Sequence, residues 1–112
     1  MASNKPVLRI GLIGTGFRGK THVFGFAAAA RVFDLPFELV FQTVADRTDA
    51  LAAEAARSLG FAQGTGDWRS LVADPAIDLV DITAPNALHR EMALAAIAAG
   101  KHVYCEKPLA PR

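Results

Sequence analysis

The stretch Val7 to Gly19 reads V-L-R-I-G-L-I-G-T-G-F-R-G, a short apolar run that leads directly into a Gly-x-Gly-x-x-Gly pattern. A glycine-rich turn between a strand and a helix is the fingerprint of a dinucleotide-binding turn. The first glycine permits the tight bend, the second lets the backbone approach a pyrophosphate, and the third allows close helix packing. This pattern predicts that a dinucleotide binds at Gly14, Thr15, Gly16, Phe17, Arg18 and Gly19.

Strand and helix patterns alternate along the whole chain, which favours a parallel sheet with helices on both faces. Expected strands are Val7–Ile13, Glu38–Ala45, 79–83 and His102–Cys105, with a weak strand near 61–62, and expected helices are 17–33, Asp49–Leu59, Trp68–Ala73 and 88–99. Right-handed crossovers then predict a Rossmann-type doubly wound α/β sheet of order 3-2-1-4-5, in truncated form. The order reverses between the first and fourth strands, so the loops at 14–19 and 84–89 should border the ligand crevice.

Bulk properties narrow the class of protein. The 112 residues suit one dinucleotide-binding domain spanning residues 1–112, and the net charge of +1 comes from scattered basic residues. We therefore expect no nucleic-acid partner. No apolar run reaches the ~18 residues of a membrane span, and the short polar leader does not resemble a signal peptide. The single Cys105 favours a reducing, cytoplasmic setting, and the three histidines show no metal-ligand spacing with it.

Two charged residues follow the expected second strand. An acid at the position of Asp46 commonly hydrogen-bonds the ribose hydroxyls of NAD and repels the 2′-phosphate of NADP. Asp46 lies farther from the glycines than the usual ~20 residues, which we attribute to a longer first helix. A helix cap or a solvated loop carboxylate is the alternative for Asp46. Arg47 would stack on adenine or pair with a 2′-phosphate, so the sequence favours NAD and leaves NADP open.

Glu106-Lys107-Pro108 follows the expected last strand, at the edge of the sheet where substrate crevices lie. A lysine there can exchange a proton with a reacting oxygen, especially where desolvation lowers its pKa. A solvated loop lysine is the alternative reading. Cys105 is expected to be a buried strand residue, and His22 and His102 are expected to be structural.

Three motifs together resemble the glucose–fructose oxidoreductase / inositol dehydrogenase / rhizopine catabolism (Gfo/Idh/MocA) family. They are G-L-I-G-T-G-F-R-G-K-T-H at 11–22, V-D-I-T-A-P-N-A-L-H at 80–89 and A-G-K-H-V-Y-C-E-K-P at 99–108. They occur in the family's order and span nearly the whole chain. The resemblance implies that the glycine turn binds NAD or NADP. It also implies that Lys107 lies beside the nicotinamide and the substrate hydroxyl as the catalytic residue, with Pro85, Asn86, His89 and Glu106 contributing to the cofactor site.

Family members are about three times as long, and their second half forms the substrate pocket. The resemblance therefore implies that this chain corresponds to the cofactor-binding part of an oxidoreductase that moves hydride between a nicotinamide and a sugar or polyol alcohol. The alternative is a nucleotide-binding fragment with no turnover of its own. A methyltransferase also has a glycine-rich first turn, but the Glu-Lys-Pro and Ala-Pro-Asn loops favour the oxidoreductase. We expect the isolated chain to lack turnover and to self-associate through its last strand.

Overall fold

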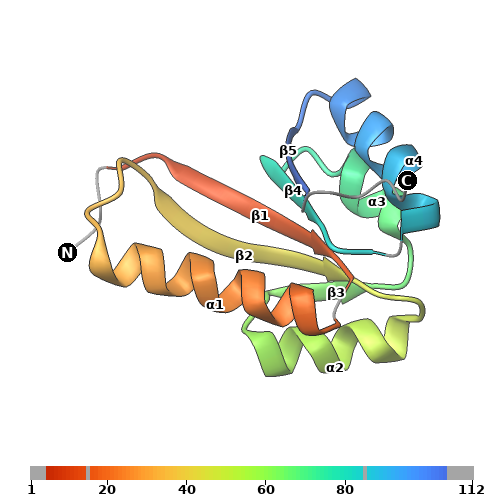
Figure 1. The fold of residues 1–112 in the computed structure, drawn as a ribbon, viewed down its shortest axis with the longest axis horizontal. Coiled ribbons are helices and arrows are strands. Elements are labelled where there is room, and N and C mark those ends of the chain that lie inside the picture. Colours follow the sequence, from red (N-terminus) through yellow and green to blue (C-terminus); the bar gives the residue numbers. More distant parts are fainter. Residues whose placement is uncertain (1–4, 15, 85, 106–112) are drawn as a thin grey trace.

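The computed structural model describes residues 5–14, 16–84 and 86–105, which form five strands and four helices (Figure 1). In chain order the elements are β1 (Val7–Ile13), α1 (Phe17–Val32), β2 (Glu38–Ala45), α2 (Asp49–Leu59), β3 (Gln63–Thr65), α3 (Trp68–Ala73), β4 (Leu79–Ile82), α4 (Asn86–Ala98) and β5 (His102–Cys105). All strand pairs are parallel, and the sheet order is β3-β2-β1-β4-β5. The predicted fold class and sheet order are therefore confirmed.

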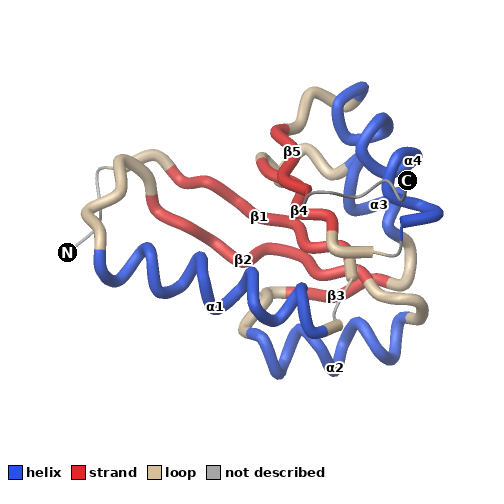
Figure 2. The backbone as a smooth tube through the Cα atoms, in the orientation of Figure 1, coloured by secondary structure: helices blue, strands red, loops and turns tan. Residues whose placement is uncertain are grey.

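The central strand β1 has its neighbours in register at the carboxyl edge of the sheet. Its last residue, Ile13, pairs with Ala45 at the end of β2 and with Ile82 at the end of β4. The three strands consequently end side by side, as the tube in Figure 2 shows. The turns that follow β1, β2 and β4 are thereby gathered at one edge of the sheet, where α/β proteins of this kind bind ligands.

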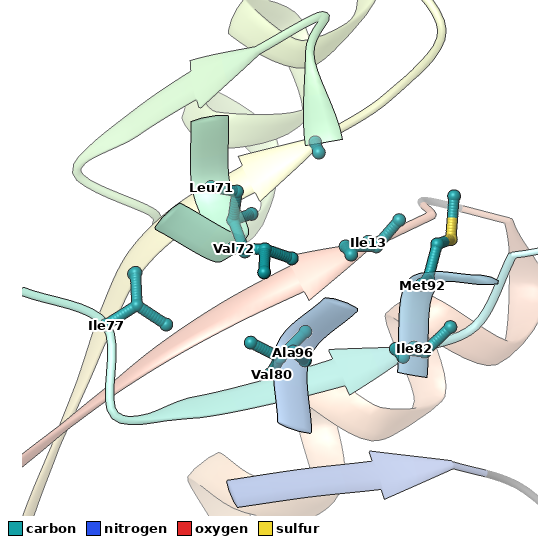
Figure 3. Packing of buried hydrophobic residues seen from close by; sticks show 9 residues of the cluster. Ile13, Leu71, Val72, Ile77, Val80, Ile82, Met92 and Ala96 are labelled. Carbon is teal, nitrogen blue, oxygen red and sulfur yellow. The ribbon is translucent and has the colours of Figure 1, made fainter. Parts of the chain in front are cut away.

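Each face of the sheet carries its own core. Consecutive residues of a strand point to opposite faces, so Leu12 packs with Val44 on the side of α1 and α2, while Ile13 packs on the side of α3 and α4. Figure 3 shows the second of these clusters, which is formed by Ile13, Ala45, Leu71, Val72, Ile77, Val80, Ile82, Met92 and Ala96. Burial on both faces explains why the strands read as nearly continuous apolar runs.

Several helix ends follow the expected side-chain chemistry. The hydroxyl oxygen of Thr48 accepts a hydrogen bond from the Leu51 amide at 3.1 Å, and an Asp67 carboxylate oxygen accepts one from the Arg69 amide at 3.0 Å. Gly60 ends α2 with a φ of 85°, a left-handed conformation that favours glycine. Within the described ranges, no helix is long and apolar enough to cross a membrane.

The weak strand expected near 61–62 begins two residues later than expected. Phe61 is buried against Leu12 and Val44, and its amide donates to the Ala56 carbonyl at 2.9 Å, which completes the end of α2 instead of a strand ladder. The strand forms directly afterwards, as β3. Four other boundaries also moved: α1 ends one residue earlier than expected and β4 ends at Ile82, while α4 begins two residues earlier, at Asn86, and ends one residue earlier, at Ala98.

Candidate dinucleotide-binding site

The turn between β1 and α1 is held from both sides. The Gly14 amide donates to the Ala45 carbonyl at 3.0 Å, which ties the turn to the end of β2. On the other side, the Thr83 hydroxyl lies 3.0 Å from the carbonyl oxygens of both Ile13 and Gly14. The turn therefore has a fixed position at the point where the sheet order reverses. Sequence reasoning did not single out Thr83.

The three glycines of the turn have different surroundings. Gly14 has a φ of +98°, and a Cβ there would lie 2.8 Å from the Thr83 hydroxyl. A Cβ on Gly19 would lie 2.5 Å from the Gly14 carbonyl oxygen. A Cβ on Gly16, in contrast, would meet nothing within 4 Å among the described residues, and the φ of Gly16 is an ordinary −69°. The protein itself accounts for Gly14 and Gly19, whereas Gly16 faces open space.

The N-terminus of α1 suits an anion. Gly16 occupies the N-cap position and has no side chain with which to satisfy the first amides of the helix. No acidic residue lies in the first turn, and the sequence instead places Arg18 and Lys20 there. Positive side chains at this end oppose the helix dipole, and a bound phosphate would relieve that repulsion.

Asp46 and Arg47 continue from β2 next to this turn. The Asp46 amide donates to the Thr65 carbonyl at 3.1 Å, which fixes the backbone against β3. The Asp46 carboxylate accepts the Arg47 amide at 2.7 Å, and the Arg47 side chain is exposed. Because Ala45 both precedes Asp46 and accepts the Gly14 amide, the carboxylate and the glycine turn belong to one edge of the sheet.

The remaining predicted site residues are placed as follows. His89 lies in the first turn of α4 and is 7% exposed, so only a small part of its surface is available for contact. Phe17, Arg18 and Asn86 are described only as backbone at the starts of α1 and α4. Thr15, Pro85, Glu106 and Lys107 lie outside the described residues. Their assignment to the site remains a prediction.

A buried pair behind the turn was missed by the sequence reasoning. Asp81 of β4 is 1% exposed, and its carboxylate oxygens lie 2.8 and 2.9 Å from Nδ1 of His22 on α1. The signal was present in the sequence, because a carboxylate within the apolar run of β4 needs a buried partner.

Cys105, expected to be buried, is only half-buried. Desolvation of the thiol is the larger cause, and the nearby Asp81 charge the smaller, of a pKa that is raised above its usual value.

Comparison with known proteins agrees with this geometry. The Gfo/Idh/MocA model, described as an oxidoreductase family with an NAD-binding Rossmann fold, matches residues 8–112. The chain belongs to this family. It is 52% identical over 104 residues to levoglucosan dehydrogenase of Pseudarthrobacter phenanthrenivorans, covering 92% of this chain and 27% of that protein. It is 34% identical to inositol 2-dehydrogenase/D-chiro-inositol 3-dehydrogenase of Lactiplantibacillus plantarum, covering 93% of this chain and 28% of that protein.

Solved structures give the same result. A levoglucosan dehydrogenase in complex with NADH has a TM-score of 0.89 and 51% identity, covering 93% of this chain and 28% of that chain. The chain thus spans less than a third of the length of these Gfo/Idh/MocA relatives. The matched part is the NAD-binding Rossmann domain, as predicted.

Proposed function

We propose that this Gfo/Idh/MocA chain binds NAD at the turn from Gly14 to Gly19, as the cofactor domain of an enzyme acting on a sugar or polyol alcohol. The observation that carries the proposal is Gly16, because its missing side chain faces open space beside an uncapped helix N-terminus. A pyrophosphate at that position explains the glycine, since it requires close approach of the backbone. The names of the relatives, levoglucosan and inositol dehydrogenases, support the alcohol class.

The chemistry that we assign to the site is hydride transfer between the nicotinamide and a carbon that bears a hydroxyl group. Lys107 would hold or release the proton of that hydroxyl as the catalytic residue. Pro85, Asn86, His89 and Glu106 would line the cofactor around the nicotinamide. These roles rest on the family membership and on the position of these residues after β4 and β5.

Asp46 should make the chain prefer NAD over NADP, because a carboxylate beside a 2′-phosphate is repulsive. Replacing Asp46 with serine should lower the ratio of the NADPH dissociation constant to the NADH dissociation constant by about tenfold, which corresponds to ~1.4 kcal/mol. Calorimetric titration of both variants with NADH and NADPH measures that ratio. Tighter binding of NADPH by the unmodified chain would show that the exposed Arg47 decides the preference instead.

The 112-residue chain alone should bind NADH without catalytic turnover, because we assign the substrate pocket to a separate domain. Incubation with NAD and either levoglucosan or inositol, followed by absorbance of NADH, tests this expectation. Lys107→Ala serves as the control for contaminating activity. Steady NADH production that disappears in Lys107→Ala would show that this part of the enzyme is sufficient for catalysis.

The chain should also self-associate through β5. This strand lies at the end of the sheet order, and its Tyr104 is 46% exposed. An edge strand that carries apolar surface favours pairing with another chain. Sedimentation velocity at increasing protein concentrations should show a rising average mass. A single monomeric species at every concentration would refute the proposal.

The scattered basic residues and the single cysteine lead us to propose a cytoplasmic location and no nucleic-acid partner.

A further inference from the structure

The His22–Asp81 pair connects the cofactor turn to the strand beneath it. Nδ1 of His22 approaches both oxygens of the Asp81 carboxylate, and the two side chains are only 8% and 1% exposed. With Asp81 ionised, its oxygens only accept hydrogen bonds, and Nδ1 of His22 is then the donor. The ring of Tyr104 packs on His22 with 5.1 Å between ring centroids, which covers the pair from β5.

β4 and the residue directly after it therefore hold the segment from Gly14 to His22 at both ends. Thr83 contacts the Gly14 carbonyl at the start of the segment, and Asp81 contacts His22 one helical turn after Gly19. The helix N-terminal amides that would face a phosphate lie between these two attachments. A change at either attachment would shift those amides relative to the sheet.

The apolar anchoring of α1 is sparse. Val23 is the buried hydrophobic residue of this helix among its described side chains, and it packs into the cluster with Leu12 and Val44. Large apolar residues such as Phe24 and Val32 are exposed, at 68% and 72%. Phe26 adds an edge-on contact with the Tyr104 ring, at 6.2 Å between ring centroids. These apolar contacts are not directional, whereas the hydrogen bond between His22 and Asp81 is, so it is suited to fix the orientation of the helix.

We propose that the His22–Asp81 pair is the positioning contact that orients the N-terminus of α1 toward the cofactor phosphates. The inference rests on the proposed function, because it assigns the pair a role in the affinity of the same site. The pair does not touch the phosphates. The pair acts by fixing the direction of the helix axis. Both Asp81 carboxylate oxygens lie beside Nδ1 of His22, so the imidazole is held in one orientation.

Replacing both residues with leucine separates this role from a role in stability. Exchanging a buried ion pair for apolar residues of similar size is often neutral or stabilising, because it removes the cost of desolvating two charges. The His22→Leu/Asp81→Leu variant should keep its melting temperature within a few degrees and bind NADH about tenfold more weakly. The single variant His22→Asn keeps Asp81 and retains a donor near the position of Nδ1. It should therefore keep most of the NADH affinity of the unmodified chain.

The experiment combines calorimetry with NADH and amide NMR shifts of Gly14, Gly16 and Gly19 in the absence of cofactor. The matched control is Arg69→Leu/Glu91→Leu, which removes an exposed ion pair far along the chain from the turn and should change neither readout. If the double leucine variant does not fold, Asp81→Asn keeps the shape and one acceptor oxygen and should show an intermediate loss of affinity.

Unchanged NADH affinity together with unchanged glycine amide shifts in a folded variant would overturn the proposal. The failure of the proposed function looks different, because the unmodified chain would then bind no NADH. In that case the amide shifts alone decide whether the pair positions the turn, since they need no cofactor.

Discussion

Replacing Gly16 with valine should abolish detectable NADH binding while the chain remains folded. The valine side chain meets no protein atom near its Cβ, so the folded state loses only the preference for glycine over valine at an N-cap, at most ~1 kcal/mol. The same side chain would occupy the position that we assign to the pyrophosphate. We expect affinity to fall at least ~100-fold, which corresponds to ~2.7 kcal/mol. Calorimetry and a melting curve on the same sample separate the two effects.

Gly25 provides the matched control for this substitution. It lies on the same helix, and a Cβ there also meets nothing within 4 Å. Gly25→Val should bind NADH normally and be no less stable than the original chain, because valine is a better residue than glycine inside a helix. Gly16→Ser adds a second comparison, since serine is a good N-cap. It should preserve stability and still weaken binding. Normal affinity in both Gly16 variants would place the cofactor elsewhere.

Replacing Gly19 with valine should instead damage the fold. Its Cβ would lie 2.5 Å from the carbonyl oxygen of Gly14, and relief requires the turn and α1 to move apart. We expect a loss of about 3 kcal/mol of unfolding free energy, at the upper end for overpacking. For a chain of this size, that loss lowers the melting temperature by about 10 °C or more. Thermal unfolding followed by circular dichroism measures the change.

Gly25→Val again serves as the control, because it makes the same exchange in the same helix without a close neighbour. The contrast between Gly16 and Gly19 therefore tests whether the glycines of the motif serve the ligand and the fold separately. A Gly19→Val variant with an unchanged melting temperature would mean that α1 does not pack on the turn as described.

Much of the fold could be predicted from the sequence because local patterns and global topology agree. The apolar strands, the caps at Thr48 and Asp67, and right-handed crossovers together predict the observed sheet order. The exception was Phe61, whose apolar character suggests a strand although its amide completes a helix end. Sequence patterns indicate that such a residue is buried, but they do not indicate which backbone carbonyl accepts the hydrogen bond from its amide.

The site was predictable in part, for the same physical reasons. The glycine motif marks the turn because each glycine has a local requirement that the residue type reveals. The contacts that hold the turn were not predictable, since Thr83 and the His22–Asp81 pair join segments that are distant in sequence. The motif also predicts separate roles for Gly16 and Gly19, and the structure adds the neighbour that makes Gly19 necessary, the Gly14 carbonyl oxygen.

A nicotinamide dinucleotide should bind across the β1–α1 turn, at the carboxyl edge of the sheet. An NMR titration of the ¹⁵N-labelled chain with NADH tests it most directly, because every amide reports separately. We expect the largest shifts at Gly14, Gly16, Gly19 and Asp46, with little change along the exposed face of α2. Saturable shifts confined to residues away from this edge, or no shifts at millimolar NADH, would contradict it.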